Sequence, residues 1–246
     1  MLIERRAYTF RPGTLDAFWK AQTDRGVDPA TRPIMARLIC YFETASGPRD
    51  QIVHLWRYDS YDDWFARLFF KSPKAEPYYR AVRPLMLAQE NRFMLPAPVA
   101  EFSPLWSDRQ DWLTGAAPIA DLELYPELMV EEDTTVLQPG SLPAYWEACR
   151  ALAGGSDENA RHRMIGCFYT LVGQQHQVTQ YRWHTDLAER EALMRAQRGA
   201  PVRQRFLEAI RPLTVSQQVI LLRPAPVAEL VPLFRRSSPA APNRHP

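Results

Sequence analysis

The sequence contains no continuous run of about 18 apolar residues, which is the length that a membrane-spanning helix needs. Its opening residues, MLIERRAYTF, have no apolar segment behind a charged one, so we expect no secretory signal. Only three cysteines occur, and Cys40, Cys149 and Cys167 form neither a metal-binding pair nor an even disulfide set. These absences predict a cytoplasmic protein with packing cysteines.

Charge of one sign is not in excess either. The 30 basic and 28 acidic residues leave a net charge of +2, which argues against a nucleic-acid partner. Lysine is scarce, because Lys20, Lys71 and Lys74 are the only three among the basic residues. We attribute the excess of arginine to the coding bias of a GC-rich bacterial genome. The hydrophobic fraction of 46 % is ordinary for a globular chain and suffices for a core.

Sequence signatures of cofactors and metals are also missing. There is no glycine-rich phosphate loop, no Gly-x-Ser-x-Gly elbow and no close His or Cys spacing of the metal-binding type. We therefore expect no cofactor and no metal. A metal or haem would have to be held by residues that are distant in the sequence.

The sequence instead repeats itself. Pro96–Glu101 and Pro224–Glu229 are identical and lie 128 residues apart, and Arg83-Pro84-Leu85 recurs at the same offset as Arg211-Pro212-Leu213. Trp19 matches Trp146 at offset 127. Colinear matches of this kind indicate an internal duplication with small loop insertions.

Each copy has the pattern of strand, helix, strand, strand, helical region, strand. In the first copy we expect strands at Ile3–Phe10, Leu38–Thr44, Gln51–Tyr58 and Asn91–Leu95. Helices are expected from Thr14, over Tyr61–Ser72 and from about Glu76 to Ala88, with Thr14 and its counterpart Ser141 as N-caps.

A βαββαβ unit is the ferredoxin-like motif, in which helices cover one face of the sheet. The other face needs a partner, and two units in one chain can cover each other. We predict an α+β fold in which the two repeats form one pseudo-dimeric barrel. The expected organisation is a first repeat at 1–102, a linker at 103–127, a degenerate second repeat at 128–234 and a disordered tail at 235–246.

The residues from Cys40 to Ser60 resemble the NIPSNAP family, with a Tyr-Phe-x-x-x-x-Gly turn followed by His54-Leu55-Trp56-Arg57-Tyr58. The resemblance extends over about residues 1–98 and is weaker over 128–226, where His54 and Trp56 have no counterparts. It implies a dimeric α+β barrel. The wider superfamily includes monooxygenases, haem-handling proteins, isomerases and lyases, which is an analogy of fold only.

Alternation along the strand places His54, Trp56 and Tyr58 on one face. A histidine beside two aromatic residues is suited to lining a small-molecule pocket, as a base or a hydrogen-bond donor. We predict His54 and Tyr58 as catalytic residues and Trp56 and Tyr41 as substrate-binding residues. The alternative is an aromatic core face with a satisfied histidine.

Glu4, Arg6 and Tyr8 share a face of the first strand, where charged groups face either a wet cavity or a solvated edge. Arg6 and Tyr8 are further predicted substrate-binding residues. In the second copy, Arg182 takes the place of Trp56 and is expected to pair with Glu131 or Asp133 across the sheet or to hold an anion. His184 completes the predicted binding set.

Two functions remain open from the sequence. The first is a cofactor-independent enzyme that acts by acid/base chemistry on a small, largely apolar organic molecule, as a monooxygenase, isomerase or lyase would. The second is a non-catalytic binding protein or scaffold. We expect a monomer or homodimer, with the apolar segments Phe102–Trp106 and Leu230–Phe234 available to join chains.

Overall fold

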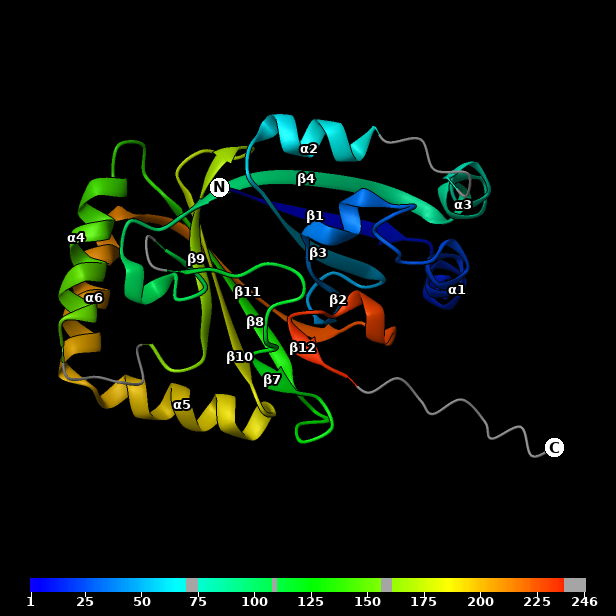
Figure 1. The fold of residues 1–246 in the computed structure, drawn as a ribbon. Coiled ribbons are helices and arrows are strands. Elements are labelled where there is room, and N and C mark those ends of the chain that lie inside the picture. Colours follow the sequence, from blue (N-terminus) through cyan, green and yellow to red (C-terminus); the bar gives the residue numbers. More distant parts are fainter. Residues whose placement is uncertain (70–74, 108–109, 156–160, 237–246) are drawn as a thin grey trace.

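The chain folds as one closed barrel of eight strands, shown by the computed structural model in Figure 1. The structure describes residues 1–69, 75–107, 110–155 and 161–236. Around the barrel the strands follow the order β1-β3-β2-β11-β8-β10-β9-β4. Helices α1, α2 and α3 lie on one side of the barrel and α4, α5 and α6 on the other (Figure 1).

The barrel strands alternate with the helices in the order βαββαβ, twice over. The strands of the first repeat are β1 (Leu2–Phe10), β2 (Leu38–Ser46), β3 (Gln51–Tyr58) and β4 (Met86–Pro96), and those of the second are β8 (Met129–Leu137), β9 (Met164–Val172), β10 (Gln177–His184) and β11 (Thr214–Pro224). The helices are α1 (Leu15–Arg25), α2 (Tyr61–Leu68), α3 (Ala75–Val82), α4 (Leu142–Ala153), α5 (Leu187–Gly199) and α6 (Pro201–Ile210). In the described part of the chain, four two-residue strands lie outside the barrel: β5 (Trp106–Ser107), β6 (Gln110–Asp111), β7 (Ala120–Asp121) and β12 (Phe234–Arg235).

Two equivalent seams join the repeats. In one seam β4 pairs with β9 and Pro96 lies opposite Phe168, and in the other β11 pairs with β2 and Pro224 lies opposite Phe42. Backbone bonds just beyond the two prolines match as well, because Ala97 N donates to Cys167 O over 2.8 Å and Ala225 N donates to Tyr41 O over 2.9 Å. This pseudo-two-fold relationship confirms the predicted barrel within one chain.

The last part of each repeat differs from the sequence-based expectation. Helix α3 ends at Val82, a 3-10 turn covers Arg83–Leu85, and β4 begins at Met86. The predictions of a helix to Ala88 and a strand from Asn91 were therefore wrong. Pro84 is the physical reason, because it has no N–H for a helix and disfavours helical geometry at the residue before it.

The two expected N-caps also differ. Neither Thr14 nor Ser141 accepts a capping bond with its side chain, and Thr14 Oγ1 instead donates to Arg11 O over 2.7 Å. Ser60 and Asp186 do cap α2 and α5, by accepting from Asp63 N and Glu189 N. Ser60 and Asp186 lie two residues after the ends of β3 and β10, so both repeats begin the helix that follows their third strand in the same way.

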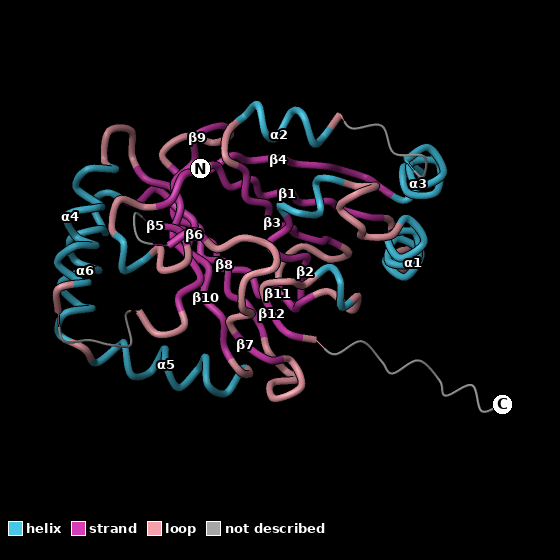
Figure 2. The backbone as a smooth tube through the Cα atoms, viewed as in Figure 1, coloured by secondary structure: helices cyan, strands magenta, loops and turns pink. Residues whose placement is uncertain are grey.

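The segment between the repeats packs on the barrel instead of hanging free. Trp106 and Trp112 are buried, and Thr114 Oγ1 donates to Leu38 O over 2.6 Å. Figure 2 shows this mostly irregular segment running across the end of the barrel, where β7 pairs with β12.

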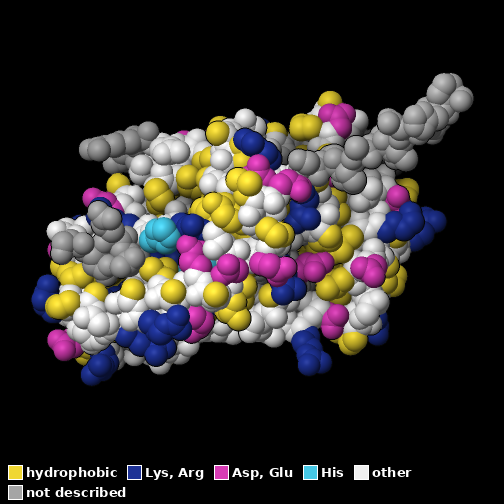
Figure 3. All heavy atoms as spheres, turned by 90° about the horizontal axis from the view of Figure 1, so that it is seen from below, with side chains coloured by type: hydrophobic (Ala, Val, Ile, Leu, Met, Phe, Trp, Pro, Cys, Tyr) yellow, Lys and Arg dark blue, Asp and Glu magenta, His cyan; other side chains and the backbone are white. Residues whose placement is uncertain are grey.

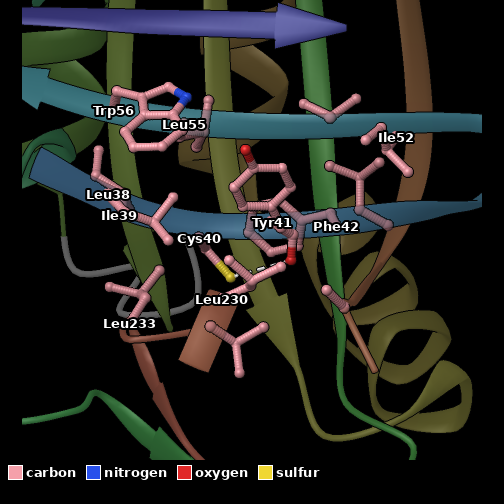
Figure 4. Close-up of a cluster of buried hydrophobic side chains, with 14 of the residues drawn as sticks. Leu38, Ile39, Cys40, Tyr41, Phe42, Ile52, Leu55, Trp56, Leu230 and Leu233 are labelled. Atoms are coloured by element: carbon pink, nitrogen blue, oxygen red, sulfur yellow. Dashed lines mark hydrogen bonds between the residues drawn. The ribbon is translucent and has the colours of Figure 1, made fainter. Parts of the chain in front are cut away.

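The C-terminal segment is part of the same packing. Figure 4 shows Leu230 and Leu233 beside the residues of β2, and Leu233 N donates to Ile39 O. Phe102, Trp106 and Phe234 are also buried. The apolar segments expected to join chains are therefore covered by their own chain. Arg235 ends β12, Arg236 is also described, and residues 237–246 of the expected tail lie outside the described residues.

The surface is mixed in character. Figure 3 shows acidic, basic and hydrophobic side chains interspersed over the face seen from below Figure 1. Among the described residues, no helix combines the length and the apolar character that crossing a membrane requires.

Candidate functional site

A cavity of about 530 Å³ lies over the sheet of the first repeat. Strand alternation directs Arg6 and Tyr8 of β1, Tyr41 of β2 and Trp56 of β3 into its wall. These are four of the predicted binding residues. The remaining lining comes from α1, the loop after it, α2, α3 and the start of β4: Arg25, Arg32, Pro33, Ile34, Arg67, Leu68, Phe69, Ala75, Tyr78, Tyr79, Val82, Arg83, Met86 and Gln89.

His54 lies beside this wall and is only 1 % exposed. Its imidazole stacks on the ring of Tyr41, with centroids 4.2 Å apart and planes 3° apart. The ring of Tyr8 meets it edge-on at 4.7 Å. Trp56 Nε1 donates to His54 Nδ1 over 2.6 Å, whereas His54 Nε2 is buried with no hydrogen-bond partner among the described residues.

This geometry fixes the protonation of His54. Burial, together with the nearby cations Arg6, Arg32 and Arg5, holds the pKa of His54 well below its usual value, so the ring is neutral at neutral pH. Because Nδ1 accepts from Trp56, the single proton resides on Nε2. His54 therefore presents a hydrogen-bond donor, and its one lone pair is occupied.

Glu4 organises the other predicted residues. It is fully buried and accepts from Arg6 Nη2 at 2.7 Å, Tyr58 Oη at 3.1 Å and Asn91 Nδ2 at 2.8 Å. Tyr58 thus contacts this carboxylate and is not among the cavity-lining residues. Since β1 lies between β3 and β4, the edge-strand interpretation of Glu4 and Arg6 was wrong.

The same face of the second repeat is packed. Thr135, Cys167 and Gln180 stand where the first repeat has Tyr8, Tyr41 and His54. Gln180 Nε2 donates to the buried phenol of Tyr145 over 2.9 Å. Cys167 and Tyr145 belong to a hydrophobic core formed between the second sheet and the helices α4 and α6.

Arg182 and His184 lie on β10, outside the cavity-lining set. The carboxylates proposed as partners of Arg182 have other bonds as well: Glu131 pairs with Arg190 at 2.5 Å, and Asp133 accepts from Gln217 at 3.0 Å. His184 is fully buried. Burial lowers its pKa to about 4, with a further contribution from Arg182.

Sequence reasoning missed the far wall of the cavity. Arg25, Arg32 and Arg83 are distributed over a helix end, a loop and a turn, and no spacing in the sequence connects them. Tyr78 and Val82 do carry a signal, since they stand four residues apart on the buried face of α3.

Within the described part of the chain, no three His, Cys, Asp or Glu side chains cluster as a metal site would require. The chemistry that the cavity wall offers is donation from phenols and guanidinium groups, with aromatic surface between them.

Comparison with known proteins gives a family and a fold. The model of the NIPSNAP family matches residues 3–103 and again residues 131–229. No curated protein matches the chain. A NIPSNAP-like domain protein from Burkholderia xenovorans is 33 % identical over 44 % of this chain and 97 % of that one, with a TM-score of 0.37.

Other solved structures match nearly the whole chain. A putative monooxygenase from Lactobacillus acidophilus has a TM-score of 0.56 at 8 % identity and covers 91 % of this chain and 93 % of its own. An anthrone oxidase-like protein has a TM-score of 0.54 at 13 % identity, covering 91 % of each chain. At these identities the similarity shows the fold alone.

Proposed function

Since the chain belongs to the NIPSNAP family and completes its barrel with a second, diverged copy, we propose that it is a small-molecule enzyme whose site is the cavity of the first repeat. One observation carries this proposal. Aromatic rings and hydrogen-bond donors surround a cavity over the first sheet, whereas Tyr145, Cys167 and Gln180 pack the same face of the second. Pockets of this size and lining are typical of small-molecule sites.

The donors at this wall suit reactions in which negative charge develops on the substrate. Burial raises the pKa of Tyr8 to about 12, so its phenol keeps its proton at neutral pH. A preorganised O–H or N–H donor stabilises an oxyanion or enolate more strongly than water does. Proton transfer beside a carbonyl, as in an isomerase or lyase, forms such a charge. We assign Tyr8 as the hydrogen-bond donor that stabilises this charge, and His54 as the residue that holds Tyr8 and Tyr41 in place.

Two solved structures of the same fold bear the names of enzymes, a putative monooxygenase and an anthrone oxidase-like protein. They favour the enzyme interpretation without identifying a substrate. A specific observation favours the alternative of a binding protein: the described residues that line the cavity include no carboxylate, and the lone pair of His54 is occupied. A general base would have to be solvent or the substrate itself.

A metabolite-profiling experiment distinguishes the enzyme from the binding protein. We expect the purified protein to convert a compound in a small-molecule extract of bacterial cells, as followed by mass spectrometry. The variants Tyr8→Phe and His54→Gln, the latter placing in the first repeat the residue found at position 180, should lose the conversion. His184→Gln is the control and should retain it. Full conversion by both cavity variants would contradict the proposal, and a compound that is retained but unchanged would favour the binding protein.

The proposal includes a cytoplasmic location and a monomer or homodimer. The three cysteines are free and buried, which suits a reducing compartment. The barrel is completed within one chain, so no second chain is needed to cover its sheets.

A further inference from the structure

The cavity of the first repeat is cationic. Five arginines line it, and the described lining residues include neither aspartate nor glutamate. Two of these arginines are already balanced: Arg6 pairs with Glu4 at 2.7 Å and Arg67 pairs with Asp63 at 2.5 Å. The other three, Arg25, Arg32 and Arg83, have no carboxylate partner within the described ranges of the chain.

Arg32 is the most constrained of the three. Its side chain is buried, with 5 % of the residue exposed; Nη1 donates to Gly26 O over 3.1 Å, and the guanidinium also hydrogen-bonds the neutral phenol of Tyr41, which supplies no counter-charge. Arg32 Nε is buried with no partner among the described atoms. A guanidinium that is removed from water without a counter-charge is strongly disfavoured. Its retention here points to a charge supplied from outside the chain.

Arg25 and Arg83 are held by aromatic rings. The guanidinium of Arg25 lies 4.2 Å from the ring centroid of Tyr78, and that of Arg83 lies 5.0 Å from that of Tyr79. Stacking on a ring fixes the plane of a guanidinium group while its N–H edges remain available for a ligand. The fold thus orients two further cations at the same cavity.

The second repeat has lost this arrangement. At the positions equivalent to Arg25, Tyr41 and Tyr78 it carries Leu152, Cys167 and Phe206, and all three pack in its core. The cation at Arg25 and the rings beside it therefore belong to the open cavity of the first repeat, whereas Arg83 keeps a counterpart in Arg211.

We propose that the cavity binds an organic carboxylate, with the carboxyl group on Arg32 and Arg25 and an apolar body along Trp56. The proposal rests on the cavity being the ligand site, as in the proposed function, and adds the charge of the ligand. A planar guanidinium matches a carboxylate in bidentate geometry. Ile34, Leu68, Val82 and Met86 supply the apolar surface that an aromatic or aliphatic body requires. Burial, with the neighbouring Arg25, lowers the pKa of Arg32. A bound anion would offset both effects.

Titration calorimetry on the full chain tests this inference with matched ligands. The probes are aromatic monocarboxylates with one and two rings, the primary amide of each acid, and inorganic phosphate. The variants are Arg32→Gln and Arg25→Gln. The control variant is Arg203→Gln. Arg203 lies 5.0 Å from the ring centroid of Phe206 in the second repeat, so this variant removes a ring-stacked arginine away from the cavity.

We expect at least one acid to bind, and its amide to bind at least about ten-fold more weakly. Arg32→Gln and Arg25→Gln should each weaken binding of the acid by about 10- to 100-fold, the range expected for one lost charge-assisted hydrogen bond. Arg203→Gln should bind like the unaltered protein. Arg32→Gln should unfold at no lower temperature without ligand, because it removes an uncompensated charge; if it fails to fold, Arg25→Gln carries the comparison.

Equal binding of acids and amides would overturn the inference and leave the cavity as a site for uncharged organic molecules, so the proposed function would stand. Phosphate binding as tight as that of the acids would assign the cations to phosphate instead. Binding of no acid at millimolar concentration would also overturn the inference. The proposed function fails on separate evidence, namely conversion that survives Tyr8→Phe and His54→Gln.

Discussion

Arg5 and Glu132 occupy equivalent positions in the two repeats, 127 residues apart, and form a buried ion pair with each other. Arg5 Nη2 lies 2.8 Å from Glu132 Oε1 and Arg5 Nε lies 2.9 Å from Oε2, while Tyr181 donates to Glu132 over 2.8 Å. In a barrel of two identical copies, the same residue would stand at both positions, and two equal charges would face each other. Duplication within one chain has allowed the two copies to become complementary.

Breaking this ion pair should destabilise the barrel strongly. Glu132→Leu leaves the guanidinium of Arg5 buried without its carboxylate, so we expect a loss of about 3–5 kcal/mol in the free energy of unfolding. The double exchange Arg5→Glu/Glu132→Arg should recover much of it. Urea denaturation measures both, with Lys20→Ala, from an exposed pair, as a control that loses less than about 1 kcal/mol. A double exchange as unstable as Glu132→Leu would show that the pairing itself contributes little.

The tautomer of His54 is directly observable. Because Trp56 Nε1 donates to His54 Nδ1, the ¹⁵N spectrum at neutral pH should show a neutral ring protonated on Nε2. Trp56→Phe removes the donor, and the ring should then populate both tautomers. A charged His54 at pH 7, or a proton on Nδ1 in the unaltered protein, would contradict the geometry.

Acid should destabilise the protein partly through its buried histidines. Burial lowers the pKa of His184 to about 4, and in the unfolded chain it is about 6.5. Between these values the unfolded chain binds a proton that the folded chain does not, so stability is complete above about pH 6.5 and falls toward pH 4. His184→Gln should therefore show a shallower loss of stability over this range in urea titrations at a series of pH values. Parallel curves for the two proteins would refute the assignment.

The cysteines should be unreactive in the folded protein. Cys40, Cys149 and Cys167 are buried, and burial raises the pKa of each thiol, to about 12 for Cys149. A thiol reagent such as DTNB should modify none of them rapidly under native conditions and all three in urea. Rapid native modification of one cysteine would mean that its part of the core opens.

The fold could be predicted because the same pattern of strands and helices occurs twice in the sequence. Repeated residues such as Pro96 and Pro224 fix the offset, and strand alternation then assigns the faces. The boundary between α3 and β4 was predicted less accurately, because Pro84 ends the helix earlier than the spacing of apolar residues suggests. Backbone chemistry prevailed there over hydrophobic spacing.

The candidate site could be predicted only on its sheet side. Strand period places Arg6, Tyr8 and Trp56 on one face, and all three line the cavity. The opposite wall comes from segments that converge only in three dimensions, so Arg25 and Arg32 carried no sequence signal. The bond between Trp56 and His54 within one strand also has no signature in the sequence, although it decides where the imidazole proton resides.

The two seams of the barrel have a consequence for synthesis on the ribosome. The outer strands of the first repeat, β2 and β4, pair with β11 and β9, which are translated much later. At about 5–20 residues per second, the edge of β2 waits roughly 10 to 35 seconds for Thr214–Pro224 to emerge. Until β9 emerges the nascent chain exposes two unpaired sheet edges, and afterwards the edge of β2 alone, to which strands of neighbouring nascent chains can add. The tandem arrangement keeps the correct partner tethered to the same chain, and translation speed thereby becomes one of the factors that set the yield of folded protein.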